Sequence, residues 1–115
     1  MKTLTKQIIY KNKVYDIVFN LNVMEEIQEK YGSLDKWAKL TSSNKGSEPN
    51  AKAVIFGFTA MINEGLEISN ETNNENNSLL TEKQVGRMIT DIGLKESTSK
   101  LQETVIESTN TEEKN

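Results

Sequence analysis

The chain contains neither cysteine nor histidine, and these two absences exclude many kinds of active site. Without cysteine there is no disulfide, no thiol nucleophile and no thiolate metal site. Without histidine there is no imidazole base, no Ser-His relay and no ordinary zinc site. Any catalysis would therefore depend on carboxylates, lysines and hydroxyls alone.

The acidic residues show no spacing typical of a catalytic or metal site. Glu25 and Glu26 are neighbours in an expected helix, where successive side chains point about 100° apart, so they do not converge on one substrate. The acidic residues of Asn70–Ser78 lack the Asp-x-Asp-x-Asp-Gly order of a calcium loop. No glycine-rich phosphate loop is present. We therefore expect no catalytic residue, no metal and no cofactor.

Long apolar runs and a strong excess of one charge are also missing. No run approaches the roughly 20 residues of a membrane span, and the first residues lack the apolar stretch of a signal peptide. The net charge is only −3. Four scattered lysines near the start (Lys2, Lys6, Lys11, Lys13) are typical of a solvated surface rather than a nucleic-acid arm. We expect no membrane contact, no nucleic-acid partner and a place in the cytoplasm.

The first segment predicts a short hairpin. Gln7–Tyr10 and Val14–Phe19 are rich in β-branched and aromatic residues, with Lys11-Asn12-Lys13 between them. Asn12 tolerates the positive φ that a tight turn needs. We expect the face that carries Tyr15, Ile17 and Phe19 to be buried. Two strands alone are marginally stable, so this hairpin must pack on helices.

Capping residues and apolar periodicity predict helices near 21–31, 51–66 and 82–92, with a short helix after Ser33. The expected capping residues are Asn20 or Asn22, Ser33 and a Thr81/Gln84 capping box at the starts, and Gly32, Gly65 and Gly93 at the ends. The helix 51–66 is apolar on all sides and should be central. Gly57 weakens it by about 1 kcal/mol relative to alanine unless a neighbour packs closely there. We expect a polar loop over Thr41–Glu48 and a mobile, low-complexity loop over Asn70–Ser78.

From Lys95 onward the composition changes to Ser, Thr, Glu, Lys and Asn. We expect residues 95–115 to form a flexible, disordered polar tail whose few apolar residues could fold on a partner. The predicted architecture is mainly α: a helical domain over residues 1–94 with a short N-terminal β-hairpin, followed by that tail. The candidate partner-binding side chains are Met24, Trp37, Leu101 and Val105. A place in the core is the alternative for Trp37.

Three blocks of sequence resemble the tail assembly chaperone family of long-tailed bacteriophages. The first runs from Val14 to Ser33, a strand ending in Phe-Asn and then a Glu-rich helix closing at Gly. The second is the apolar helix from Ala53 to Gly65, which ends Asn-Glu-Gly. The third, Leu80 to Gly93, is similar to the family's Leu-Thr-x-x-x-Val-Gly-x-x-Ile helix. The order and spacing of the blocks, across most of residues 14–94, carry the resemblance.

The resemblance implies a protein that binds the tape measure protein in the host cytoplasm, keeps it soluble and helps recruit tail tube subunits. It implies no catalytic residue and leaves open whether the protein is a homo-oligomer. Two alternatives remain: a phage structural subunit, such as a head–tail connector or tail component, and a small DNA-binding regulator. The helix 82–92 offers a regulator only Lys83 and Arg87 as basic residues.

The resemblance also bears on the C-terminus. In this family a longer product often arises when ribosomes slip back by one nucleotide near the end of the short reading frame. The closing residues Glu113-Lys114-Asn115 are compatible with a slippery heptamer of the A-AAA-AAY type. A longer product that shares this N-terminus is therefore one alternative that the sequence leaves open.

Overall fold

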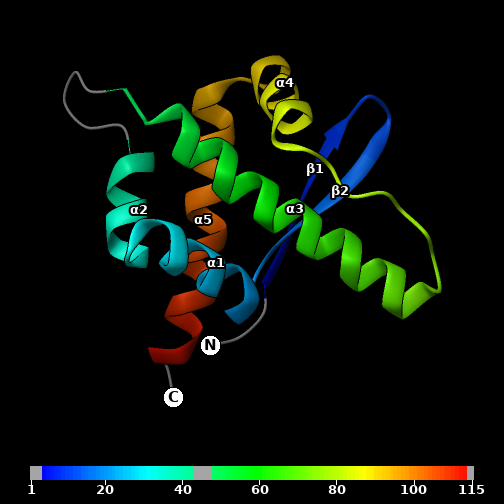
Figure 1. Ribbon diagram of the computed structural model, residues 1–115, viewed down its shortest axis with the longest axis horizontal. Coiled ribbons are helices and arrows are strands. Elements are labelled where there is room, and N and C mark those ends of the chain that lie inside the picture. The colour runs from blue at the N-terminus through cyan, green and yellow to red at the C-terminus, as the bar shows by residue number, and fades with distance from the viewer. Residues whose placement is uncertain (1–3, 43–47, 114–115) are drawn as a thin grey trace.

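A two-stranded hairpin followed by five helices makes up the residues that the computed structural model describes, 4–42 and 48–113 (Figure 1). The strands are β1 (Leu4–Tyr10) and β2 (Lys13–Phe19). The helices are α1 (Leu21–Tyr31), α2 (Leu34–Thr41), α3 (Ala51–Asn73), α4 (Glu82–Ile92) and α5 (Leu94–Glu113). The expected mainly α fold with a short N-terminal hairpin is confirmed. None of these helices is long and apolar enough to cross a membrane.

The hairpin turns tightly at Lys11 and Asn12, whose φ angles are +50° and +64°. The positive φ expected at Asn12 is confirmed, and a turn with two such residues matches the twist of the strands it joins. Of the face predicted to be buried, Ile17 and Phe19 are fully buried and Tyr15 is half-buried. The register places Ile9 opposite Val14, on the other face.

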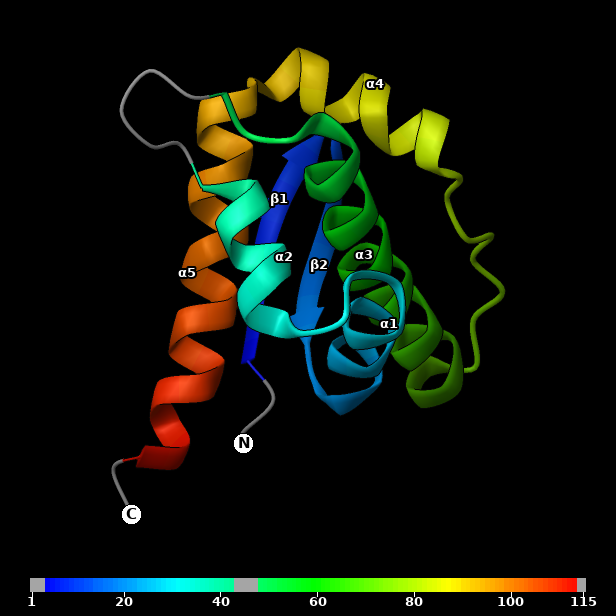
Figure 2. The same cartoon turned by 60° about the vertical axis from the view of Figure 1, so that its left-hand side comes forward.

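The helices surround the buried face of the hairpin (Figure 2). In that view β1 and β2 lie between α5 on one side and α3 on the other, α2 lies in front, and α4 crosses the end that carries the turn. The core fills the space between the hairpin and the helices. Its largest fully buried side chains include Phe19, Ile27, Trp37, Phe58 and Met61. The central place expected for the helix that begins at Ala51 is confirmed, because α3 contacts β2 and every other helix.

Most of the predicted helix ends are where the capping residues place them. Asn20 Oδ1 accepts a hydrogen bond from the amide of Val23 at 3.2 Å, and Ser33 caps α2 in the same way. The Thr81/Gln84 capping box is present. Gly32 and Gly93 end α1 and α4 with φ of +91° and +112°. These local signals therefore fix the bounds of α1 and α4 at 21–31 and 82–92.

Helix α3 is longer than the predicted 51–66 and ends at Asn73, before Asn74 with φ of +54°. Gly65 is not a C-cap, so that prediction is wrong. It lies inside the helix, where a Cβ atom would come within 2.7 Å of the carbonyl oxygen of Asp16. The absence of a side chain lets α3 pack directly on the backbone of β2.

The segment between α3 and α4 is tied down by two asparagine side chains of α3. Asn63 donates to the carbonyl of Leu80 at 2.9 Å and accepts from its amide at 2.8 Å. Asn70 does the same with Asn77, at 3.1 and 2.8 Å. The mobile loop predicted over Asn70–Ser78 is therefore wrong for its first four residues, which are helical, and Asn77 is held in place. Of the other predicted loop, Thr41–Glu48, residues 43–47 lie outside the described residues.

Helix α5 is the largest difference from the sequence expectation. Its inner face is a stripe of mostly hydroxyl side chains, all buried: Ser97, Thr98, Leu101, Thr104, Val105 and Ser108. Thr98 and Thr104 donate to backbone carbonyls of their own helix, so neither of these two buried hydroxyls is unpaired. Lys6 of β1 forms an ion pair with Glu107 at 3.0 Å. The tail predicted over 95–115 thus does not begin at residue 95, because residues 94–113 are helical and α5 packs on the rest of the domain through its inner face from Ser97 to Ser108. Lys114 and Asn115, which carry the predicted slippery site, lie outside the described residues.

Candidate protein-binding surfaces

Three of the four predicted partner-binding side chains lie in the core. Trp37 is 1% exposed, and its Nε1 donates a hydrogen bond to the carbonyl of Ala53 at 3.0 Å. Leu101 and Val105 are buried against the hairpin side of the core. None of the three is on the surface of the folded chain, and their binding role stays a prediction. For Trp37 the alternative, a place in the core, is confirmed.

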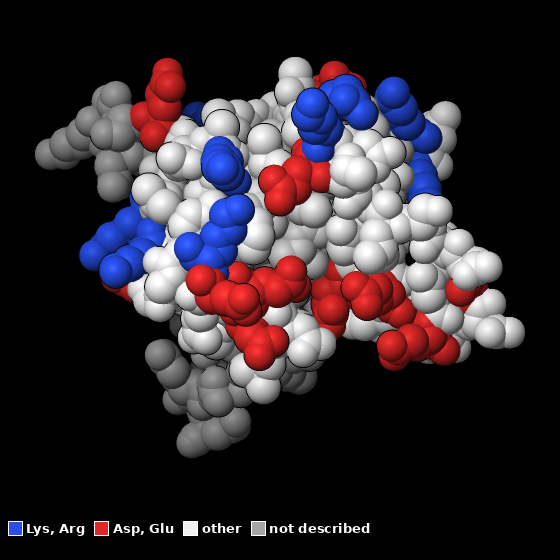
Figure 3. Space-filling view, viewed as in Figure 1, with Lys and Arg blue, Asp and Glu red and all other residues white. Residues whose placement is uncertain are grey.

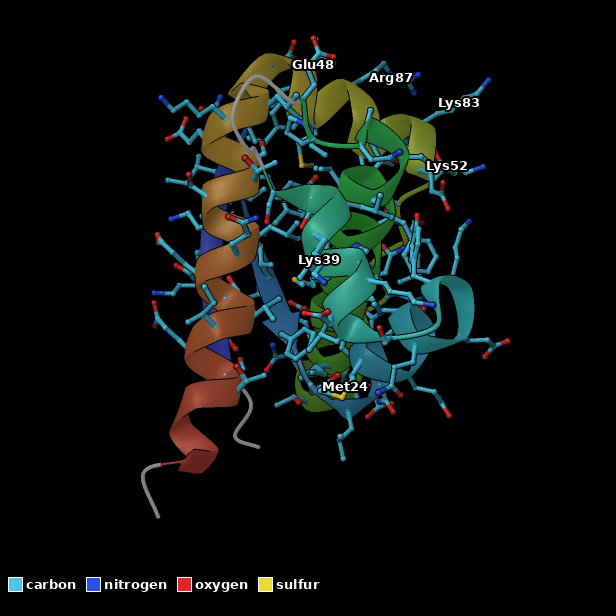
Figure 4. All side chains as sticks on the ribbon, turned by 90° about the vertical axis from the view of Figure 1, so that its left-hand side faces the viewer. Met24, Lys39, Glu48, Lys52, Lys83 and Arg87 are labelled. Atoms are coloured by element: carbon cyan, nitrogen blue, oxygen red, sulfur yellow. The ribbon has the colours of Figure 1, made fainter. Side chains whose placement is uncertain are left out.

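Met24 is the predicted binding residue that remains partly exposed. It lies half-buried on α1, at the end of the molecule opposite Arg87 (Figure 4). Its neighbour Leu21 is 68% exposed. This end therefore presents some apolar surface, although nothing that the structure describes gathers it into a cavity.

The outer face of the hairpin exposes two large apolar side chains that are cross-strand partners. Ile9 is 72% exposed and Val14 is 52% exposed. Cross-strand neighbours lie about 4.5–5.5 Å apart at Cβ, so the two form one continuous patch. Beside them the side chain of Gln7 donates to Asp16 at 3.0 Å. The sequence already contains a signal for this patch. A hairpin with one face in water alternates apolar and polar residues along each strand, whereas Ile8-Ile9 and Val14-Tyr15 place apolar residues on both faces.

A cavity of about 330 Å³ continues this patch toward the start of α5. Its apolar lining comes from Ile8, Ile9, Phe58 and Ile92, and Ser97 also lines it. Ser97 is 1% exposed, and its hydroxyl has no hydrogen-bond partner among the described residues. Glu96 and Lys100 stand at the rim. We call Ile9, Val14 and this cavity the hairpin surface.

A second candidate surface is acidic and lies between α1 and α3. A cavity of about 200 Å³ is lined by Glu26, Glu64, Glu67 and Glu82 around Phe56 and Leu79. Figure 3 shows acidic side chains gathered across this part of the molecule. Partial burial raises the pKa of Glu26, and the charges of Glu64 and Glu67 raise it further. In the described part of the chain no group of three or more acidic side chains is arranged to hold a metal ion.

Basic side chains of α3 and α4 gather on one side of the molecule, where a DNA-binding regulator could use them. Lys52, Lys83 and Arg87 extend into solvent together from α3 and α4 (Figure 4). Glu82 and Asp91 lie on the same helix as the last two. Acidic neighbours weaken the attraction for phosphates, so this arrangement adds little to the regulator alternative.

Comparison of the chain with protein-family models, with curated proteins and with solved structures returned no match. The resemblance to tail assembly chaperones therefore stays a prediction from three sequence blocks. In the structure these blocks are β2 with α1, the first half of α3, and α4 with its capping residues.

Proposed function

We propose that the protein is a phage tail assembly chaperone that binds the tape measure protein in the host cytoplasm, keeps it soluble and helps recruit tail tube subunits. The observation that supports this function best is the hairpin surface, where an apolar patch with an adjoining cavity is left uncovered. Exposed apolar patches of this kind are typical of protein–protein interaction sites. The three sequence blocks supply the identity of the client.

The hairpin surface is suited to a client with regularly spaced apolar side chains. An apolar side chain that enters the cavity between Ile8, Phe58 and Ile92 loses its contact with water, which contributes about 25 cal/mol for each Å² removed. Ile9 and Val14 would cover the next apolar side chains of the client. Covering such side chains is what prevents a long, apolar helix from aggregating.

Co-expression with the tape measure protein of the same phage tests the proposal. The wild-type chain is expected to raise the soluble yield of the tape measure protein and to co-purify with it. A variant with Ile9→Lys and Val14→Lys should lose both effects, because two charges replace the apolar patch. Ile106→Lys is the matched control, since Ile106 is 54% exposed on α5 and lies outside the hairpin surface.

The alternatives give different results in the same set of experiments. A structural subunit would remain in purified virions, where mass spectrometry detects it, whereas an assembly chaperone is absent from the finished particle. Tight, salt-sensitive binding to duplex DNA would favour the regulator. Equal solubilisation by the wild type and the Ile9/Val14 variant would remove the hairpin surface from the mechanism.

A further inference from the structure

A further cavity lies between the hairpin turn and α4. Its volume is about 430 Å³, within the range of roughly 300–1,000 Å³ that is usual for ligand sites. Tyr10, Lys11 and Tyr15 line it from the hairpin. Gln84, Arg87, Met88, Thr90 and Asp91 line it from α4, and Leu80 lies at the start of that helix. We call this cavity the turn pocket.

The two walls of the turn pocket are joined by a hydrogen bond. Tyr10 Oη donates to Asp91 Oδ2 at 2.8 Å, linking residues that are 81 positions apart in the chain. This bond uses one oxygen of the single carboxylate among the lining residues. The remaining charged side chains of the lining, Lys11 and Arg87, are both basic and exposed.

The cations at this pocket form no salt bridge within the described residues, and the acidic side chain of the lining, Asp91, lies one turn from Arg87 on α4. Lys11 Nζ lies 5.4 Å from the centre of the Tyr10 ring, and Lys13 Nζ lies 5.2 Å from that of Tyr15. Within the described residues, neither lysine nor Arg87 takes part in a salt bridge. A cation–π contact uses the charge of the ammonium group but leaves its N–H donors available to an anion. The pocket therefore carries positive charge that a ligand can neutralise.

The floor of the turn pocket is apolar. Met88 is 2% exposed, and Leu80 is half-buried and packs against the core. Methionine adapts to side chains of different shape, and tyrosine walls give large contact area with little loss of conformational freedom. We propose that the turn pocket binds a segment of a partner protein in which an apolar side chain lies next to aspartate or glutamate. The apolar side chain packs on Met88 between the two tyrosines, and the carboxylates bind Arg87 and Lys11.

A peptide fits this pocket better than a nucleic acid does. A nucleic acid brings a continuous row of phosphates, which would meet Asp91 in the pocket wall, Glu82 at the start of α4 and a chain of net charge −3. A peptide brings only one or two carboxylates, which can be placed at Arg87 and Lys11. The planar guanidinium of Arg87 suits a single carboxylate, which it can bind through two parallel hydrogen bonds. The proposal does not depend on which protein is the client of the hairpin surface.

Fluorescence anisotropy with a labelled acidic peptide tests the proposal on the full-length chain. The probe carries leucine and phenylalanine flanked by glutamates, and the comparison peptide carries glutamines instead. Binding of the acidic peptide and not of the glutamine peptide is expected, with affinity that falls as salt rises. Arg87→Glu should weaken binding about tenfold or more, because a like charge then faces the carboxylates.

Lys83→Glu is the matched control for Arg87→Glu. It makes the same change of charge one turn earlier on α4, at an exposed residue that does not line the turn pocket. The proposal expects a far smaller loss for Lys83→Glu. Equal losses for the two variants, or equal binding of the glutamine peptide, would show a general charge effect and overturn the proposal. Tighter binding of a duplex DNA oligonucleotide, displacing the peptide, would overturn it in favour of nucleic acid.

Methyl NMR locates the bound peptide independently of any variant. The methyl signal of Met88 is expected to shift when the acidic peptide is added, whereas that of Met24, at the opposite end of the molecule, should not (Figure 4). A shift at Met24 without one at Met88 would refute the assignment. These assays contain no tape measure protein, so their failure and that of the proposed chaperone function are distinguishable.

Discussion

At the scale of single residues, Gly57 of α3 packs directly against the indole of Trp37. A Cβ atom at position 57 would overlap the Trp37 ring, which therefore lies directly on the helix backbone. The weakness that glycine brings to a helix interior is offset here by the burial of the largest side chain of the protein. The sequence alone leaves both the surface and the core open for Trp37. The missing side chain of Gly57, twenty positions away, makes the room that places Trp37 in the core.

Substitution of this glycine tests that packing. Gly57→Ala should lower the free energy of unfolding by about 1–3 kcal/mol, because the displaced indole also loses its bond to Ala53, despite the better helix propensity of alanine. Gly86→Ala is the control: there a Cβ atom meets Ile55 at an ordinary 3.4 Å, so stability should hold or rise. Denaturant unfolding of both variants measures the difference. Equal effects of the two substitutions would contradict the packing.

Glu26 gives a prediction about pH. Partial burial and the neighbouring Glu64 and Glu67 raise its pKa in the folded state. The folded protein then binds more protons than the unfolded one just above the ordinary glutamate pKa of about 4.3, so Glu26 lowers stability as pH rises through that window.

Glu26→Gln should therefore raise the thermal midpoint at neutral pH, and the gain should shrink as pH falls toward 4. The control is Glu103→Gln, at an exposed position of α5 away from the acidic cavity. Thermal melts across the pH range measure both. A gain for Glu26→Gln that grows on acidification would show that the sign is wrong.

At the scale of elements, the sequence predicts those helices that have a polar cap and an apolar stripe. Helices α1 and α4 have both, and their bounds match at every residue. The end of α3 was misplaced because Gly65 has the form of a C-cap, although its function is close packing on Asp16. Only the tertiary contact distinguishes these two uses of glycine.

Helix α5 was missed for a different reason. Its buried stripe has helical spacing, but Ser97, Thr98, Thr104 and Ser108 count as polar in any hydropathy pattern. The hydroxyls of Thr98 and Thr104 bond to carbonyls of their own helix, which makes these two residues effectively apolar toward a neighbour. Because serine and threonine are small, α5 can approach the hairpin closely. This packing can be seen only in the folded structure.

Two substitutions on α5 check its inner and outer faces. Leu101→Ala should cost about 2–5 kcal/mol, because Leu101 is fully buried between α5 and the core. Ile106→Ala should change stability by no more than about 0.5 kcal/mol, since Ile106 is 54% exposed. Chemical denaturation distinguishes the two. If Leu101→Ala lowers the free energy of unfolding as little as Ile106→Ala does, this segment is a loosely attached tail and not part of the core.

At the scale of the whole molecule, the binding surfaces were harder to predict than the fold. Large or flexible apolar side chains were the predicted binding residues, but Trp37, Leu101 and Val105 of this set are buried in the core. The exposed pair Ile9 and Val14 lies on the face left over once the hairpin register is known. The turn pocket joins residues about 80 positions apart, such as Tyr10 and Asp91, and no local pattern connects them. Surfaces of this kind depend on the complete arrangement of elements.

That arrangement makes the N-terminal hairpin depend on the last helix. The strand β1 contacts α5, and Lys6 pairs with Glu107 across 101 positions of the chain. Ile8 of β1 and Leu101 of α5 belong to one core cluster with Phe58 of α3. Removal of α5 would expose the inner side of β1 and part of α3 to water. A domain boundary at residue 94 would therefore cut through the core.

A chain truncated after Gly93 should accordingly lose the cooperative thermal transition of the full-length protein. Small domains are stable by only about 5–15 kcal/mol, so the exposure of apolar core residues that α5 covers should be enough to abolish cooperative folding. A synthetic peptide of residues 94–113, added to the truncated chain, should restore a transition whose midpoint rises with peptide concentration, because the peptide binds the folded form alone. The same peptide with Leu101→Ala is the control and should restore less. If the truncated chain instead melts cooperatively at the midpoint of the full-length protein, α5 is dispensable and the domain ends at residue 93.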